Sequence, residues 1–164
     1  MRKFFGICAG AAALICLLSV PAAAQTFTAT LSGGEETPPV LTGAAGTVEV
    51  SVDAVNKEFS VTLRVFNIPS NAPTTASHIH VGPKGPALSG PVVVDFVGVA
   101  GRTGDFALTF RVGQAQFHAR PDNGIDTLDD MIQAILNGNA YVNVHTTAHP
   151  GGEIRGQLVP AAVH

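Results

Sequence analysis

Apolar and polar residues alternate along most of this chain, and the alternation predicts short β-strands separated by turns. Successive side chains of a strand point to opposite faces, so one face is buried and the other is hydrated. Val48, Val50 and Val52 alternate with polar residues, and a second alternating run over 59–65 follows a short polar turn. The two runs predict a β-hairpin. Further strands are expected around residues 27–31, 76–81, 92–94, 106–110, 141–146 and 153–158.

One segment changes period and predicts a helix. Its apolar side chains recur three and four residues apart, which places them on one helical face. They are Leu128, Met131, Ile132, Ile135 and Leu136. Asp126 or Thr127 can cap the start of this helix. A helix of about ten residues is unstable alone, so we expect it to pack over an open end of the sheets.

The number and spacing of these elements predict the fold class. About eight short strands with regularly spaced turns are typical of an all-β protein. We expect an antiparallel, Greek-key-like β-sandwich with one short helix. Residues 25–164 show no internal repeat and no second domain, so we expect them to form a single domain.

The first 24 residues have the pattern of a signal peptide. Arg2 and Lys3 precede an apolar run over 4–20, and three alanines at 22–24 form a small-residue cleavage site. An uncleaved anchor is the alternative, but the apolar run is short for a membrane span of about 20 residues. We therefore expect a secreted or periplasmic protein with no membrane span after cleavage.

Composition excludes several kinds of site and partner. Both cysteines, Cys8 and Cys16, lie in the signal segment, so the exported chain has no disulfide, thiolate nucleophile or cysteine metal site. Without Arg2 and Lys3 the net charge falls from −3 to −5. The chain has no basic run and a single tyrosine, which argues against a nucleic-acid partner.

Three histidines are the candidate metal ligands. His78 and His80 flank Ile79 on one predicted strand, and His145 follows Val144 on another, so each ring lies opposite an aliphatic neighbour. If the two strands are neighbours, three imidazoles share one surface and can bind copper or, as a second choice, zinc. The alternative is a hydrated strand face with no ligand. His118 is a possible fourth ligand.

The acidic residues do not predict a catalytic pair. Glu153 and Arg155 share a strand face, but an arginine stays protonated and cannot act as a base. Glu35 and Glu36 are adjacent and point apart, which disfavours a glycosidase pair. We expect the loop that contains them to be ordered, with one of its carboxylates near backbone donors or Arg155. No nucleophile-elbow motif is present.

Three blocks of sequence together resemble the chordin-type (CHRD) domain. They are LSGGEETPPV at 31–40, ASHIHVGP at 76–83 with GPVVV at 90–94, and the stretch from YVNVHT to the last strand at 141–158. The blocks occur in the family's order. The resemblance implies an exported β-sandwich module and leaves its activity open. The growth-factor antagonism of animal chordin is not carried over, because this chain lacks that protein's cysteine-rich modules.

A weaker resemblance connects the histidines with copper/zinc superoxide dismutase. In that enzyme a His-x-His pair and a histidine from a late strand hold copper, and His78, His80 and His145 are similarly ordered. The structural disulfide and the histidine-rich zinc loop have no counterpart here. The resemblance therefore implies a copper-only site and gives little support to dismutase activity.

These observations favour a non-enzymatic exported module of the CHRD type, with binding or structural function. Its partner would be a protein or an envelope component, bound on a sheet face or through the Pro38-Pro39 loop. The alternative is a copper- or zinc-binding protein that uses the three histidines. A redox enzyme ranks third.

The cleavage site makes a direct prediction. Intact-mass measurement of the exported protein should give a chain that begins at or near Gln25, because the alanine triplet ends just before it. A mass that retains residues 1–24 would instead indicate a membrane anchor.

Overall fold

The computed structural model describes residues 24–82 and 89–162. Residues 1–23 of the predicted signal segment and His164 lie outside the described residues. The strands are β1 (Gln25–Ser32), β2 (Ala45–Asp53), β3 (Glu58–Ile68), β4 (Thr74–Val81), β5 (Val92–Asp95), β6 (Gly104–Val112), β7 (Ala140–Thr146), β8 (Ile154–Gln157) and β9 (Val159–Pro160). The helices are α1 (Leu128–Leu136) and two 3₁₀ turns, η1 (Gly33–Glu35) and η2 (Pro121–Asn123).

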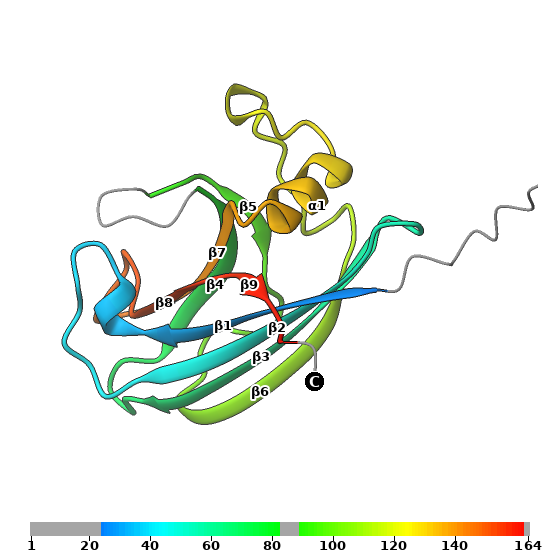
Figure 1. The fold of residues 1–164 in the computed structure, drawn as a ribbon. Coiled ribbons are helices and arrows are strands. Elements are labelled where there is room, and N and C mark those ends of the chain that lie inside the picture. Colours follow the sequence, from blue (N-terminus) through cyan, green and yellow to red (C-terminus); the bar gives the residue numbers. More distant parts are fainter. Residues whose placement is uncertain (1–23, 83–88, 163–164) are drawn as a thin grey trace, which may run out of the picture.

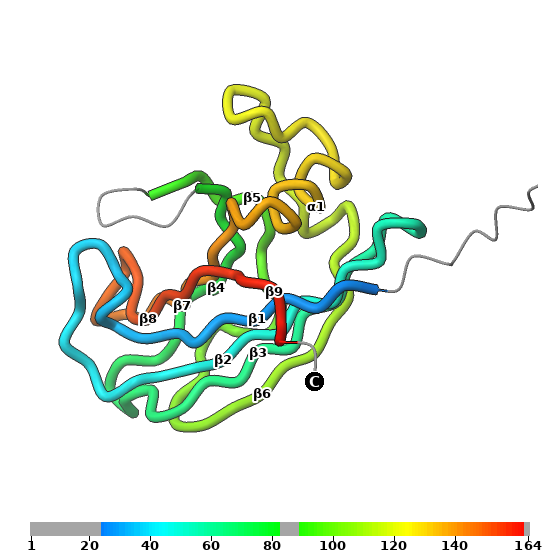
Figure 2. Tube along the Cα trace, in the orientation of Figure 1, coloured from blue at the N-terminus to red at the C-terminus, as the bar shows by residue number. Residues whose placement is uncertain are grey.

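The strands form one antiparallel sheet that curls almost into a barrel (Figure 1). Their order is β5-β4-β7-β8-β1-β2-β3-β6, and β9 also pairs with β1. The predicted all-β class with one short helix is confirmed. The two facing layers are halves of a continuous sheet, because β8 joins β1 through the pair Ser32↔Arg155. The trace in Figure 2 shows how the long strands β1, β2, β3 and β6 form one of these layers.

The alternating aliphatic residues meet between the layers. In the β2–β3 hairpin Val50 stands opposite Val61, and Val48 opposite Leu63. These four side chains are at most 2% exposed. Burying each such side chain contributes roughly 1.5–3 kcal/mol, so the predicted hairpin supplies much of the core.

Helix α1 covers one open end of the curled sheet, as expected (Figure 1). Thr127 rather than Asp126 caps it: its side chain accepts from the backbone N–H of Asp130, and the Asp130 carboxylate accepts from Thr127 N–H in return. Met131 and Ile135 on its inner face are completely buried in the core. No helix within 24–82 or 89–162 has the length and apolar character to cross a membrane.

The outer face of β7 and β8 is polar but is not hydrated. The segment from Gly33 to Ala44 packs over it, so Glu153 is only 1% exposed and Arg155 only 6%. The Glu153 carboxylate accepts hydrogen bonds from the Thr42 and Thr146 hydroxyls, the latter at 2.7 Å. The bond from Thr42 ties the covering segment to a residue 111 positions later, and the bond from Thr146 ties the end of β7 to the residue before β8.

Glu36 is the residue of this polar layer whose hydrogen bonding is incomplete. Its side chain is 7% exposed, and its Oε1 has no hydrogen-bond partner among the described residues. Gly152, with a φ of +140°, packs against it so closely that a Cβ there would lie 2.2 Å from Glu36 Oε1. Burial raises the pKa of Glu36 to about 7, although the Arg155 charge and a bond from Thr37 N–H oppose the rise. The Glu36 carboxylate therefore lies close enough to Arg155 to feel its charge, as expected for the loop that contains Glu35 and Glu36.

The raised pKa predicts how stability depends on pH. The folded protein holds the Glu36 proton more tightly than the unfolded chain, so this stabilisation is present below about pH 4.5 and lost as pH rises through about 7. Glu36→Gln stays neutral at every pH. Its free energy of unfolding relative to wild type should therefore rise by roughly 2–3 kcal/mol as the pH is raised from about 5 to about 8.

Urea denaturation across this pH range measures the gain, and the titrations common to both proteins cancel in the difference. Glu49→Gln, on the exposed face of β2, is the matched control. A difference between wild type and Glu36→Gln that stays constant with pH would contradict the account.

Candidate metal centre

The pairing of β4 with β7 brings the three candidate histidines together. Ile79 stands opposite Val142, and both side chains are completely buried in the core. The neighbouring positions therefore face outward, where His78 pairs with Asn143 and Ala76 pairs with His145. The expectation that the two histidine-bearing strands are neighbours is met.

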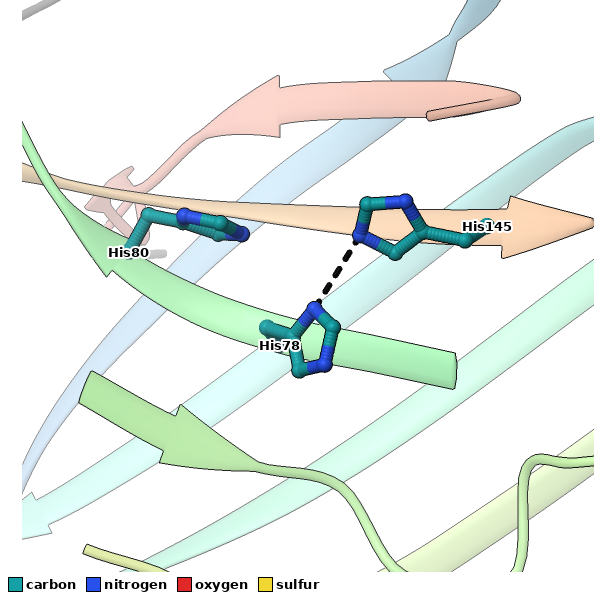
Figure 3. A group of neighbouring side chains, drawn as sticks. All are labelled: His78, His80 and His145. Atoms are coloured by element: carbon teal, nitrogen blue, oxygen red, sulfur yellow. Dashed lines mark hydrogen bonds between the residues drawn. The ribbon is translucent and has the colours of Figure 1, made fainter. Parts of the chain in front are cut away.

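The three rings converge on one small volume. One nitrogen from each of His78, His80 and His145 lies within 4.8 Å of the other two. His78 Nδ1 is 3.0 Å from His145 Nε2, and one nitrogen of His80 points toward that pair (Figure 3). Of all the groups of possible ligands in the described part of the chain, this is the one that meets the spacing for a metal ion.

Backbone carbonyls fix the tautomers of two rings. His145 Nδ1 lies 2.8 Å from Pro150 O, and His80 Nδ1 lies 2.9 Å from Gly90 O. A carbonyl only accepts, so each Nδ1 carries the proton and donates it. Each Nε2 then keeps a lone pair, which is the form that binds metal.

Asp95 lies on the other side of the His78 ring. Its Oδ1 is 3.6 Å from His78 Nε2, and its Oδ2 accepts from His118 Nε2 at 2.7 Å. His145 Nε2 has no proton of its own, so without an ion the neutral His78 donates to it from Nδ1 at 3.0 Å. An ion bound between these two nitrogens would replace that proton, and the proton of His78 would then lie on Nε2, which faces the Asp95 carboxylate.

An additional, charging proton on any of the three rings is unfavourable. Burial, followed by the neighbouring His145 and His80, lowers the pKa of His78 to about 4. Burial also lowers the pKa values of His80 and His145. At neutral pH all three rings are neutral imidazoles, the state required of metal ligands.

Aromatic and amide side chains hold His80 in place. Tyr141 stacks on its ring with centroids 4.7 Å apart and planes 4° from parallel, and Arg155 lies over the far face of Tyr141 at 3.5 Å. His80 Nε2 lies 3.0 Å from the Asn143 side-chain oxygen. A neutral His80 whose Nδ1 donates to Gly90 needs the opposite amide orientation, in which the Asn143 N–H donates. Without an ion, the Asn143 amide is therefore hydrogen-bonded to His80 Nε2, and an ion bound at that nitrogen would displace this hydrogen bond.

Access to the cluster comes from the β4–β5 side. A shallow groove of about 340 Å³ runs beside Ala76, His78, Asp95 and Phe96. The His78 side chain is 18% exposed and forms part of its wall.

The remaining predicted residues lie around this cluster. His118, the possible fourth ligand, contacts Asp95 and lies outside the three-ring group. His149 is half-exposed, with Nε2 3.7 Å from Glu153 Oε2. Sequence reasoning missed Asp95, Asn143 and the Tyr141–Arg155 stack. Tyr141 and Asn143 are spaced two residues apart on the same strand as His145, so their side chains point to the same face. This spacing is the signal that identifies them as neighbours of the site.

Comparison with known proteins gives a family and no individual relative. The family model described as CHRD domain matches residues 27–158, which include β2 to β8, all but the first two residues of β1, and all three clustered histidines. Neither a search of curated proteins nor a search of solved structures found a match. The match covers most of the chain, and the chain belongs to the CHRD domain family.

Proposed function

We propose that this protein is an exported, non-enzymatic CHRD module that binds one copper ion through His78, His80 and His145. The observation that carries the proposal is the 3.0 Å approach of His78 Nδ1 and His145 Nε2. Oxygen atoms face the other nitrogens of these two rings and Nδ1 of His80. This combination turns one nitrogen of each ring toward the same place, where an ion would replace the proton that His78 and His145 share.

The spacing favours copper over zinc. Two nitrogens 3.0 Å apart, each about 2.0–2.1 Å from one ion, subtend roughly 95° at that ion. This angle is close to that of neighbouring ligands in tetragonal Cu(II) and below the tetrahedral angle that Zn(II) adopts. Copper is also the tighter binder of the two at nitrogen sites. Nitrogens on one ion can be at most about 4.1 Å apart, so a separation of up to 4.8 Å closes slightly on binding.

A second candidate function is the recognition of a protein or envelope component. Family membership supports a binding or structural role. The loop after η1 also exposes Pro38 and Pro39, and Leu41 beside them is fully exposed. An apolar side chain presented on an ordered, proline-stiffened loop suits contact with a partner. This function is compatible with copper binding, because none of the exposed loop residues is among the three clustered histidines.

Calorimetric titration with Cu(II) and Zn(II) tests the site. Untagged exported protein should bind one copper ion, and more tightly than zinc. His78→Ala, His80→Ala and His145→Ala should each weaken copper binding by more than the roughly 10–100-fold that loss of an outer partner causes. Asp95→Asn should fall within that smaller range. His149→Ala is the control and should bind as wild type. Equal weak binding by all variants would refute the site.

The lowered pKa values predict an acid-tolerant site. Free imidazoles with a pKa near 6.5 would lose about tenfold in affinity per ring between pH 7 and pH 5.5, or about a thousandfold for three. Because the pKa of His78 is about 4 and those of His80 and His145 are also lowered, the measured loss should be well below a thousandfold. Calorimetry at both pH values measures it. A thousandfold loss would show that the rings are hydrated in solution.

A further inference from the structure

The two edge strands of the sheet, β5 and β6, differ in how well they are covered. At one end, β5 is only four residues long and is covered by the segment 116–118 through the bridge Val94↔Phe117 and the bond from His118 N–H to Val93 O. At the other end, β6 is nine residues long and pairs only with β3. No described residue outside β3 exchanges a backbone hydrogen bond with β6.

Most of the β6 edge lacks the usual protection against pairing. Sheet edges are normally blunted by proline, lysine, a bulge or short length. The sequence GDFALTFRV contains neither proline nor lysine. Its register with β3 is continuous from Phe106 to Val112, and the one register shift lies at its start, between Gly104 and Phe106. A row of backbone donors and acceptors is therefore open to another strand.

The sequence of β6 complements itself. If two copies pair antiparallel about Leu108, Asp105 stands opposite Arg111, Phe106 opposite Phe110, and Ala107 opposite Thr109. Each pair occurs twice by symmetry. Opposite charges and paired aromatics directly across a strand pair are stabilising, whereas like charges there are destabilising.

The side chains needed for this pairing are accessible. Asp105 and Arg111 are exposed on the outer face, and the Arg111 side chain is 80% exposed. Asp105 uses one oxygen to accept from Asn67 N–H, and Arg111 uses one nitrogen on Glu58. Each keeps further hydrogen-bonding atoms for a partner. On the inner face Phe106, Leu108 and Phe110 are only half-buried.

We propose that the protein forms a symmetric homodimer in which the β6 strands of two copies pair about Leu108. The two curled sheets become one continuous sheet across the two-fold axis. Both copies keep their histidine clusters free, because β4 and β7 are in the other layer of the sheet. A single strand pair buries a small interface, so dimer and monomer should exchange.

Sedimentation velocity with exported wild-type protein, metal-free and up to about 1 mM, tests the dimer. Wild type should shift from monomer to dimer as its concentration rises. Asp105→Arg and Arg111→Asp each place like charges opposite one another and should stay monomeric. An equimolar mixture of these two variants should form a heterodimer, since each then supplies the charge that the other lacks. Arg64→Asp, on the neighbouring strand β3, is the matched control and should dimerise as wild type.

A cysteine test fixes the register without altering charge. Leu108 is the one residue that pairs with its own copy, and opposite Cα atoms are about 4.5–5.5 Å apart, within reach of a disulfide. Under mild oxidation Leu108→Cys should cross-link two chains, whereas Thr109→Cys should not. Wild type that remains monomeric throughout would overturn the proposal. So would cross-linking that is equal at the two positions, or single charge variants that dimerise as wild type.

Discussion

The register between β4 and β7 is the constraint on which the proposed function depends. It places Ile79 and Val142 in the core and so sends His78, His80 and His145 to the other face. A slip of one residue would move every histidine into the core and every aliphatic side chain out of it. The cost of burying imidazoles and exposing valines holds the register in place. The hydrophobic core therefore sets the distance between His78 Nδ1 and His145 Nε2.

The polar layer on the outside of β7 and β8 gives this surface its rigidity. A solvent-facing histidine on a strand would sample several rotamers. Here Tyr141 stacks on His80, Pro150 O holds His145, and Asp95 faces His78. The segment 33–44 covers the same face and is bonded to it through Glu153. Burial lowers the pKa values of the three rings, and the same burial raises the pKa of Glu36. Desolvation thus keeps the histidines available to a metal and leaves Glu36 as a destabilising group at high pH.

Much of the fold and the centre of the site follow from local sequence pattern, while their surroundings do not. Period-two alternation identifies β2, β3 and β6 because each has one buried face, and the parity of Ile79 and Val144 orients the histidines. Alternation alone does not show that Arg155 is buried, because it carries no information about the distant segment that covers the strand; the glutamates and prolines of that segment suggest its approach to Arg155. Asp95 follows the apolar run Val92–Val94, whose lack of alternation conceals which way it points. Its contact with His118 also depends on a long-range bridge that local pattern cannot predict.

The central claim is that three imidazoles, and no other groups of the protein, hold one ion. Pulsed electron paramagnetic resonance of the copper-loaded protein measures this directly, because the remote nitrogen of each coordinated imidazole modulates the signal. The account predicts three imidazoles in wild type and two in each of His78→Ala, His80→Ala and His145→Ala. A wild-type signal from one imidazole or from backbone nitrogens, unchanged in these variants, would contradict it.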